Sequence, residues 1–236
     1  MTRRRWIADE VSGDRAFLLG QNAVHLVQVL RARVGQELEI STGQAVRLGT
    51  IRKIEKDRVE LVMGERLASP FLPHFTLLLA IFKFDRLEWA IEKATELGVA
   101  EIIPVITRRT DTHLAQAAAK RVERWRKIAH EASQQSRRLS PPEIASPIRL
   151  KDAIGTPAAA KVVLAEGFPQ GLKSVLAAAP QKESVALAIG PEGGWTSEEI
   201  SLFQAAGWIP AGLGPTILRS ETGAIAALVI AASELV

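Results

Sequence analysis

The stretch IGPEGGWTSEEI, residues 189–200, decides how the fold of this chain is interpreted. It follows the apolar run VALAI at 185–189, which has the continuous hydrophobicity of a strand buried on both faces. Thr196 and Glu199 then have the spacing of a helix capping box. A glycine-rich turn between a strand and a helix lets the backbone approach a ligand closely, although an ordinary tight turn has the same local pattern. The stretch therefore predicts a strand, a turn and a helix, and it makes the turn a candidate ligand site.

The composition of the 236-residue chain is that of a soluble globular protein, with 47% hydrophobic and 24% charged residues. This length allows one large domain or two modest ones. Cysteine is absent, which excludes disulfides and cysteine metal sites and is typical of a cytoplasmic protein. The N-terminus is basic but has no apolar core, and no run of 18 uncharged apolar residues occurs. We therefore expect neither a signal peptide nor a membrane span.

Basic residues are concentrated in the middle of the chain. Residues 107–138 hold nine Lys or Arg against three acids, whereas residues 139–236 hold six against nine. Such segregation favours an anionic macromolecule as the partner of the basic segment. A solvated helix face is the alternative interpretation of the same charges.

The periodicity of apolar residues changes near residue 70. Before it, ELEIST, AVRLGTIRKI and DRVELVMGE alternate apolar and polar residues, which predicts a small antiparallel sheet or barrel, interrupted by a short helix capped by Asn22. SPFLPH at 69–74 has the composition of a linker. Beyond it, strands and helices alternate, which favours a parallel sheet covered on both faces. We predict an α/β protein with two domains, residues 1–70 and 74–236.

Several catalytic motifs are missing from the sequence. HEAS at 130–133 is followed by Gln134 where a zinc-binding HExxH helix has its second histidine, so no metal is expected. Neither a P-loop nor a Gly-x-Ser-x-Gly elbow is present, and GPEGG does not have the GxGxxG spacing of dinucleotide folds. These absences disfavour nucleotidases, serine hydrolases and dinucleotide-dependent enzymes.

A second glycine-rich turn, GLGPTILRSET at 212–222, also lies between a predicted strand and a helix. Two such turns at the carboxyl ends of neighbouring parallel strands form one crevice, which is the usual ligand position in an open α/β sheet. Leu213, Ile217 and Leu218 would supply its apolar walls. The pair of turns therefore favours a cofactor pocket.

Five stretches in order resemble the RsmE family of bacterial 16S ribosomal RNA methyltransferases: HLVQVLRARVG, FDRLEWAIEKATELGVAEIIPVITRRT, the basic helix ending in QQSRR, IGPEGGWTSEEI and LGPTILRSETGAIAAL. The family belongs to the SPOUT class and forms N3-methyluridine from S-adenosylmethionine. The resemblance implies an N-terminal PUA-like RNA-binding barrel, a C-terminal SPOUT-type α/β domain with a trefoil knot, and a homodimer formed through the knotted region. The sequence departs from the family pattern at Thr216, where arginine is common, and at Gln134-Gln135, which replaces Glu-Gln.

By this resemblance, residues of three turns enclose the methyl donor. The expected cofactor-binding residues are Leu164, Glu166, Gly167, Gly190, Glu192, Gly193, Gly194, Leu213, Gly214, Ile217, Leu218 and Ser220. The glycines fit this role because a side chain there would keep the backbone away from the ligand. The alternative for Glu192 is that its carboxylate interacts with the N-terminus of the following helix instead of binding the cofactor.

Arg219 and Glu221 are the expected catalytic residues beside the second turn. An arginine stabilises charge that develops on the uracil oxygens, and a carboxylate takes the N3 proton or orients the base. An ion pair across a dimer would use the same two residue types. The final segment, ETGAIAALVIAASELV, is apolar on almost all sides, which predicts a helix buried in its domain or against a second subunit, and we favour the subunit.

The expected RNA contacts are basic residues of both domains, namely Arg3, Arg4, Arg5, Arg31, Arg33, Lys83, Arg86, Arg137 and Arg138. Phosphate neutralisation by such residues makes binding strongly salt-dependent. Tyrosine is absent and aromatic residues make up 5% of the chain, so recognition would depend on backbone and shape, with one base extruded into the pocket. The expected partner is 16S rRNA or the small ribosomal subunit. Two alternatives remain: a SPOUT enzyme that methylates another RNA position, such as a ribose hydroxyl, and a non-catalytic RNA-binding factor.

Overall fold

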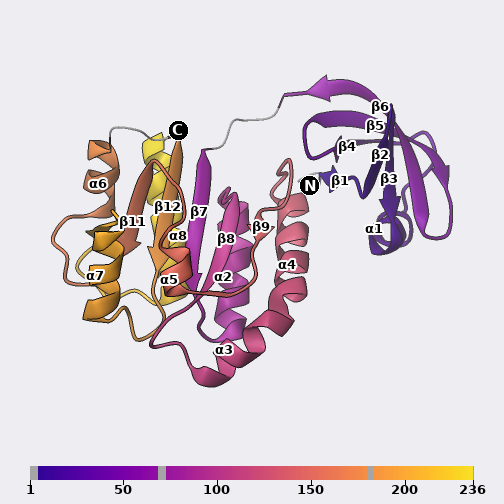
Figure 1. Ribbon diagram of the computed structural model, residues 1–236. Coiled ribbons are helices and arrows are strands. Elements are labelled where there is room, and N and C mark those ends of the chain that lie inside the picture. Colours follow the sequence, from indigo (N-terminus) through magenta and orange to yellow (C-terminus); the bar gives the residue numbers. More distant parts are fainter. Residues whose placement is uncertain (1–4, 69–72, 180–182, 236) are drawn as a thin grey trace. The chain divides into compact units, whose positions relative to one another are not determined.

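The computed structural model describes residues 5–68, 73–179 and 183–235 and divides into two compact units (Figure 1). The first unit comprises residues 1–71 and 133–140, and the second comprises residues 72–132 and 141–236. The predicted linker at 69–74 falls largely on residues 69–72, which lie outside the described residues.

The first unit is built on one curled sheet of six strands. The strands follow the order β1 (Trp6–Ile7), β4 (Glu37–Ser41), β5 (Val46–Ile54), β6 (Arg58–Leu67), β3 (Arg15–Leu19) and β2 (Glu10–Ser12). All neighbours are antiparallel except β1 and β4. Alternate residues such as Leu18, Ile40 and Leu61 are buried in one core. The alternation in the sequence therefore produces a small barrel-like sheet, as predicted.

The helical segment of this unit begins differently from the prediction. The structure has α1 (Gly20–Val24) followed by a π-helical turn, η1 (His25–Val29). Asn22 does not cap the helix, because its side-chain amide donates to both carboxylate oxygens of Asp9 at 3.1 and 3.2 Å. The Asp9 carboxylate also accepts a hydrogen bond from the backbone N–H of Leu19, at 2.7 Å. The asparagine therefore holds a loop instead of a helix end.

Residues 133–140 belong to the first unit, although they lie far in sequence from its other residues, 1–71. The backbone N–H of Arg5 donates to the carbonyl of Gln134 at 3.1 Å, and the Arg5 guanidinium donates to the carbonyl of Arg137. Glu39 of β4 accepts from both arginines, and its hydrogen bond with Arg137 holds the pKa of this carboxyl below its usual range. The basic QQSRR stretch is thereby tied to the small sheet.

The second unit is built on a parallel sheet. Its strands follow the order β10 (Ile148–Arg149), β8 (Glu101–Ile106), β7 (His74–Ala80), β12 (Ser184–Ile189), β11 (Ala160–Leu164) and β13 (Ile209–Ala211), with β9 (Glu143–Ile144) pairing to β8. Every pair is parallel. The predicted parallel α/β architecture is confirmed, and the strand expected at 185–189 is β12.

Helices cover both faces of this sheet. One core joins the sheet to α2 (Phe84–Glu96), α4 (Val122–Gln135), α6 (Leu172–Ala178) and α8 (Ser220–Leu235), and the opposite core joins it to α5 (Leu150–Ala153) and α7 (Ser197–Ala205). Short segments α3 (Thr112–Ala118) and η2 (Ala119–Arg121) precede α4. On β7, Leu77 and Leu79 enter the first core while Leu78 enters the second. The central strands are thus buried on both sides, which their continuous apolar runs require.

The C-terminal helix α8 is buried along one side only. Ala224, Ala227, Leu228 and Ala231 belong to the first core, where small residues let α8 approach the sheet. Val229 is 47% exposed. The burial of α8 inside its own unit is therefore incomplete. Within the described residues, no helix has the length and apolar character needed to cross a membrane.

Candidate functional site

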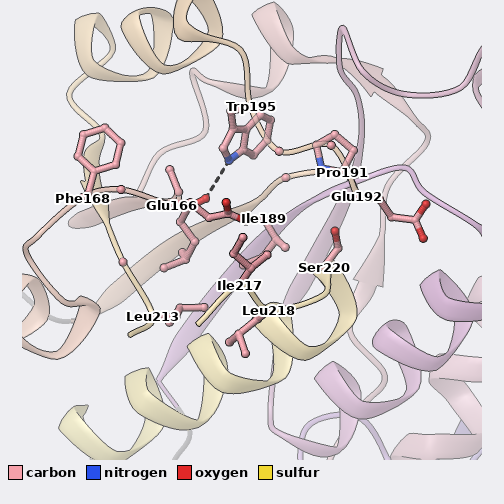
Figure 2. A pocket seen from close by; sticks show the side chains of 18 of the residues that line it. Glu166, Phe168, Ile189, Pro191, Glu192, Trp195, Leu213, Ile217, Leu218 and Ser220 are labelled. Atoms are coloured by element: carbon pink, nitrogen blue, oxygen red, sulfur yellow. Dashed lines mark hydrogen bonds between the residues drawn. The ribbon is translucent and has the colours of Figure 1, made fainter. Parts of the chain in front are cut away.

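Three loops meet at the carboxyl ends of the neighbouring strands β12, β11 and β13. They are the first turn (residues 190–194), the β11 loop (165–171) and the second turn (212–219), and together they line a cavity of about 930 Å³. Figure 2 shows Pro191 and Trp195 on one side of it and Leu213 and Leu218 on the other, with Ile217 between them. Strand order thus brings the two glycine-rich turns of the sequence into one pocket.

The first turn has a defined backbone. The N–H of Gly194 donates to the carbonyl of Pro191 at 2.8 Å, and Gly194 has a φ of 69°, a conformation that side chains disfavour. The predicted capping box then starts α7: Thr196 Oγ1 accepts from the N–H of Glu199 at 3.2 Å, and Glu199 Oε2 accepts from the N–H of Thr196 at 2.9 Å. Local sequence therefore sets where the turn ends.

Trp195 fastens the first turn to the sheet. Its indole Nε1–H donates to the carbonyl of Leu164, the last residue of β11, at 2.9 Å (Figure 2). A Cβ on Gly190 would lie 3.2 Å from the same indole, so a side chain there would crowd the ring where it packs on the backbone. Sequence reasoning missed this residue, and its position directly after the glycine pair was the available signal.

Arg109 holds the first turn from another loop. Its guanidinium donates to the carbonyl of Gly193, and it lies 3.4 Å from the carbonyl of Trp195. A Cβ on Gly193 would lie 3.2 Å from Cδ of Arg109. The adjacent backbone N–H of Arg108 donates to the buried Glu199 at 2.8 Å. Sequence reasoning missed Arg109, although it follows β8 at the same edge of the sheet as the two turns.

The second turn passes tightly against the β11 loop. The N–H of Gly212 donates to the carbonyl of Gln170 at 2.9 Å, and the carbonyl of Gly212 accepts from Leu172 at 3.0 Å. A Cβ on Gly212 would lie 2.8 Å from the carbonyl oxygen of Phe168, closer than real Cβ atoms approach. Gly214, with a φ of 121°, then directs the chain along the cavity. Close backbone approach is therefore the reason for glycine at position 212.

The cavity is lined by all of the residues predicted to bind the cofactor: Leu164, Glu166, Gly167, Gly190, Glu192, Gly193, Gly194, Leu213, Gly214, Ile217, Leu218 and Ser220. Arg219 and Thr216 also line it, and both are exposed. Their roles remain predictions, but the geometry brings them together around one space with polar backbone, apolar side chains and the two carboxylates of Glu166 and Glu192.

Glu221 lies beside the cavity instead of lining it. It is 7% exposed, and its Oε1 lies 3.8 Å from Nε of Arg86. Nη1 of the same arginine contacts Oε1 of Glu192 at 2.6 Å. Within the described part of the chain, Oε2 of Glu221 is buried and has no hydrogen-bond partner. Within this part of the chain, the basic side chain beside Glu221 is therefore Arg86, and the alternative of an ion pair between Arg219 and Glu221 across a dimer stays a prediction.

The predicted RNA contacts have different environments. Arg31 and Arg33 of the first unit and Lys83 of the second are exposed. Arg5 is only 6% exposed and is bonded to Glu39, so it is not an accessible contact here, and Arg137 pairs with the same glutamate. Partial burial lowers the pKa of Arg138 to about 10, which leaves it charged at neutral pH. Arg3 and Arg4 lie outside the described residues.

Two family models match the chain. Residues 69–232 match an RNA methyltransferase domain, and residues 18–63 match an RNA methyltransferase PUA domain. The first match covers more than half of the chain.

Curated relatives and solved structures agree with these models. The ribosomal RNA small subunit methyltransferase E of Rickettsia conorii is 33% identical over 217 residues, covering 89% of this chain and 86% of the relative. The protein of that name from Bacillus subtilis is 29% identical over 224 residues, covering 89% and 87%. Among structures, the enzyme of that name from Neisseria gonorrhoeae, bound to S-adenosyl methionine, has a TM-score of 0.85 at 28% identity, covering 96% of this chain and 95% of that one. A methyltransferase from Legionella pneumophila in complex with the same cofactor has a TM-score of 0.84 at 30% identity, covering 98% and 96%.

Proposed function

Because the chain belongs to the family of ribosomal RNA small subunit methyltransferase E, we propose that it transfers a methyl group from S-adenosylmethionine to N3 of a uridine in 16S ribosomal RNA. The observation that carries this proposal is the single cavity formed by the first turn, the β11 loop and the second turn. The proposed site of methylation on the base rests on the family resemblance of the sequence.

The residues of the cavity suit S-adenosylmethionine. A volume of about 930 Å³ lies within the usual range for small-molecule sites. Side chains at Gly190 and Gly193 would press on Trp195 and Arg109, which also line the cavity, so larger residues there would disturb its wall. Leu213 and Leu218 offer apolar surface to an adenine, and the carboxylate of Glu166 favours a cationic ligand. The bound cofactor would supply a methyl group activated by its sulfonium.

The polar residues beside the cavity can prepare the uracil. Its N3 carries a weakly acidic proton that must leave as the nitrogen is methylated. The buried oxygen of Glu221 has no partner among the described residues, and in this proposal it receives or orients that N–H. Arg219, exposed on the cavity wall, stabilises the negative charge that develops on the uracil oxygens. Both residues would act on the base, while the turns hold the methyl donor.

We further propose the assembly and the partner of the protein. The small ribosomal subunit or its 16S rRNA would be the substrate in the cytoplasm, with the exposed Arg31, Arg33 and Lys83 among the phosphate contacts. The exposed side of α8, including Val229, would join a second copy of the chain. The close passage of Gly212 against the β11 loop would be part of the family's trefoil knot. Residues 1–70 and 74–236 would be the RNA-binding and catalytic domains.

The proposal is tested by incubating the protein with radiolabelled S-adenosylmethionine and small ribosomal subunits that lack the modification. The RNA is then digested to nucleosides and separated by liquid chromatography with mass spectrometry. Labelled N3-methyluridine is the expected product. Label on a ribose 2′-oxygen would instead indicate the alternative methyltransferase, and absence of transfer together with absence of cofactor binding would indicate an RNA-binding factor.

A further inference from the structure

Arg86 contacts one carboxylate that lines the cavity and a second one that lies beside it. It lies in the first turn of α2, next to the buried Leu87 that anchors this helix in the core. Its Nη1 is 2.6 Å from Glu192 of the first turn, and its Nε is 3.8 Å from Glu221 at the start of α8. Since α8 continues directly from the second turn, one guanidinium connects the two glycine-rich turns.

The two carboxylates differ in what they require from this arginine. Glu192 is well exposed, so water solvates its charge and the ion pair contributes little. Glu221 is 7% exposed, and a buried carboxylate is costly unless a cation compensates it. Within the described residues, Arg86 is the only basic side chain within 4.0 Å of either carboxylate. Glu221 therefore depends on Arg86 for the compensation of its charge.

The distance from Arg86 to Glu221 is also informative. At 3.8 Å it is too long for a hydrogen bond but short enough for charge stabilisation. The other oxygen of Glu221 is buried without a partner among the described residues. Arg86 thus stabilises the charge of the carboxylate while leaving it able to accept a hydrogen bond. For a uracil N3–H to be that donor, the base must displace the residues that bury this oxygen.

We propose that Arg86 is a positioning residue that orients Glu221 and ties the first turn to the start of α8, and that it is not a phosphate contact. The role at Glu221 rests on the proposed function, whereas the tie between the turns concerns the shape of the cofactor cavity alone. An RNA phosphate could reach the guanidinium, which is 31% exposed, only by competing with Glu192. The arginine is held from one side by the first turn and from the other by α8.

The test compares Arg86→Gln and Arg86→Lys with the control Arg124→Gln. Arg124 is an exposed arginine of the same unit that pairs with Glu88 at 2.8 Å, so its replacement removes the same charge away from the cavity. Methyl transfer is measured against RNA concentration at several salt concentrations, and the affinity for S-adenosylmethionine is measured by calorimetry. Circular dichroism establishes that each variant is folded.

We expect Arg86→Gln to lower kcat by about 10- to 100-fold, with KM for RNA and its salt dependence unchanged, and to weaken cofactor binding several-fold. Arg86→Lys keeps the charge but not the extended guanidinium that reaches both carboxylates, so it should recover part of kcat. Arg124→Gln should behave as the wild type. A rise in KM for RNA with an unchanged kcat and a smaller salt slope would overturn the inference, because that pattern belongs to a phosphate contact.

Two further outcomes keep the test decisive. If Arg86→Gln does not fold, Arg86→Lys decides by the same split between kcat and KM. If the wild type transfers no methyl group, the proposed function fails, and calorimetry then decides the tie between the turns: equal cofactor affinities of Arg86→Gln and Arg124→Gln would overturn it.

Discussion

The passage of the second turn against the β11 loop gives a quantitative prediction for Gly212→Ala. The added Cβ would lie 2.8 Å from the carbonyl oxygen of Phe168, whereas ordinary contact begins at 3.4 Å. The backbone would have to move by about 0.6 Å in a closely packed place, and overpacking of this kind costs about 1–3 kcal/mol. For a chain of this length, a loss of about 2 kcal/mol lowers the melting temperature by about 4–8 °C.

The matched control is Gly171→Ala, at the residue paired with Gly212 in an isolated parallel bridge. A Cβ there would meet no atom within 4 Å. Gly171 is the N-cap of α6, where alanine is less favourable than glycine, so we expect the free energy of unfolding of this variant to fall by no more than about 1 kcal/mol. Thermal and urea denaturation followed by circular dichroism provide the comparison. Equal stability of the two variants would refute the argument that position 212 requires glycine because of close backbone approach.

Three other predictions concern the supports of the site and of the first unit. Trp195→Phe removes the hydrogen bond to Leu164 and leaves a buried carbonyl unpaired, so the free energy of unfolding measured by urea denaturation should fall by about 1–3 kcal/mol. A decrease below about 0.5 kcal/mol would contradict this. Arg109→Gln releases the carbonyl of Gly193 and should weaken the binding of S-adenosylmethionine about 10-fold in calorimetry. The control Arg108→Gln keeps the backbone hydrogen bond of Arg108 and should bind the cofactor as the wild type does. Equal affinities of the two variants would count against the role of Arg109. Glu39→Gln tests a carboxyl whose pKa is lowered from 4.5, chiefly by its hydrogen bond with Arg137. The wild type should be more stable than the variant above pH 4.5, and this difference in stability should disappear as the pH falls through the lowered pKa. A stability difference that does not depend on pH would exclude the ion pair as its cause.

Features that depend on local sequence were predictable. The capping box of Thr196 and Glu199 involves residues three positions apart, and its hydrogen bonds form as expected. The parallel sheet follows from the alternation of apolar runs with helical periods. The meeting of the two glycine-rich turns follows from a general rule about the carboxyl ends of parallel strands.

Features that depend on contacts between distant residues were not predictable from these patterns. Asn22 has the local position of a helix cap, but its side chain donates a hydrogen bond to Asp9 instead. Residues 133–140 continue a basic helix in the sequence, yet their hydrogen bonds to Arg5 place them with the small sheet. Arg86 looks like any surface arginine of an amphipathic helix until Glu192 and Glu221, more than a hundred residues away, are placed beside it. In each case a long-range partner decides between roles that the local pattern allows.

Calorimetric titration with S-adenosylmethionine decides whether the first turn is part of a cofactor site. It is carried out on the wild type, on Gly193→Val and on the control Gly155→Val, where a Cβ would meet no atom within 4 Å. We expect one cofactor bound per chain for the wild type and the control, and loss of binding for folded Gly193→Val, whose side chain would press on Arg109 at the cavity wall. Absence of binding to the wild type, with or without RNA, or unchanged binding to Gly193→Val would contradict this expectation.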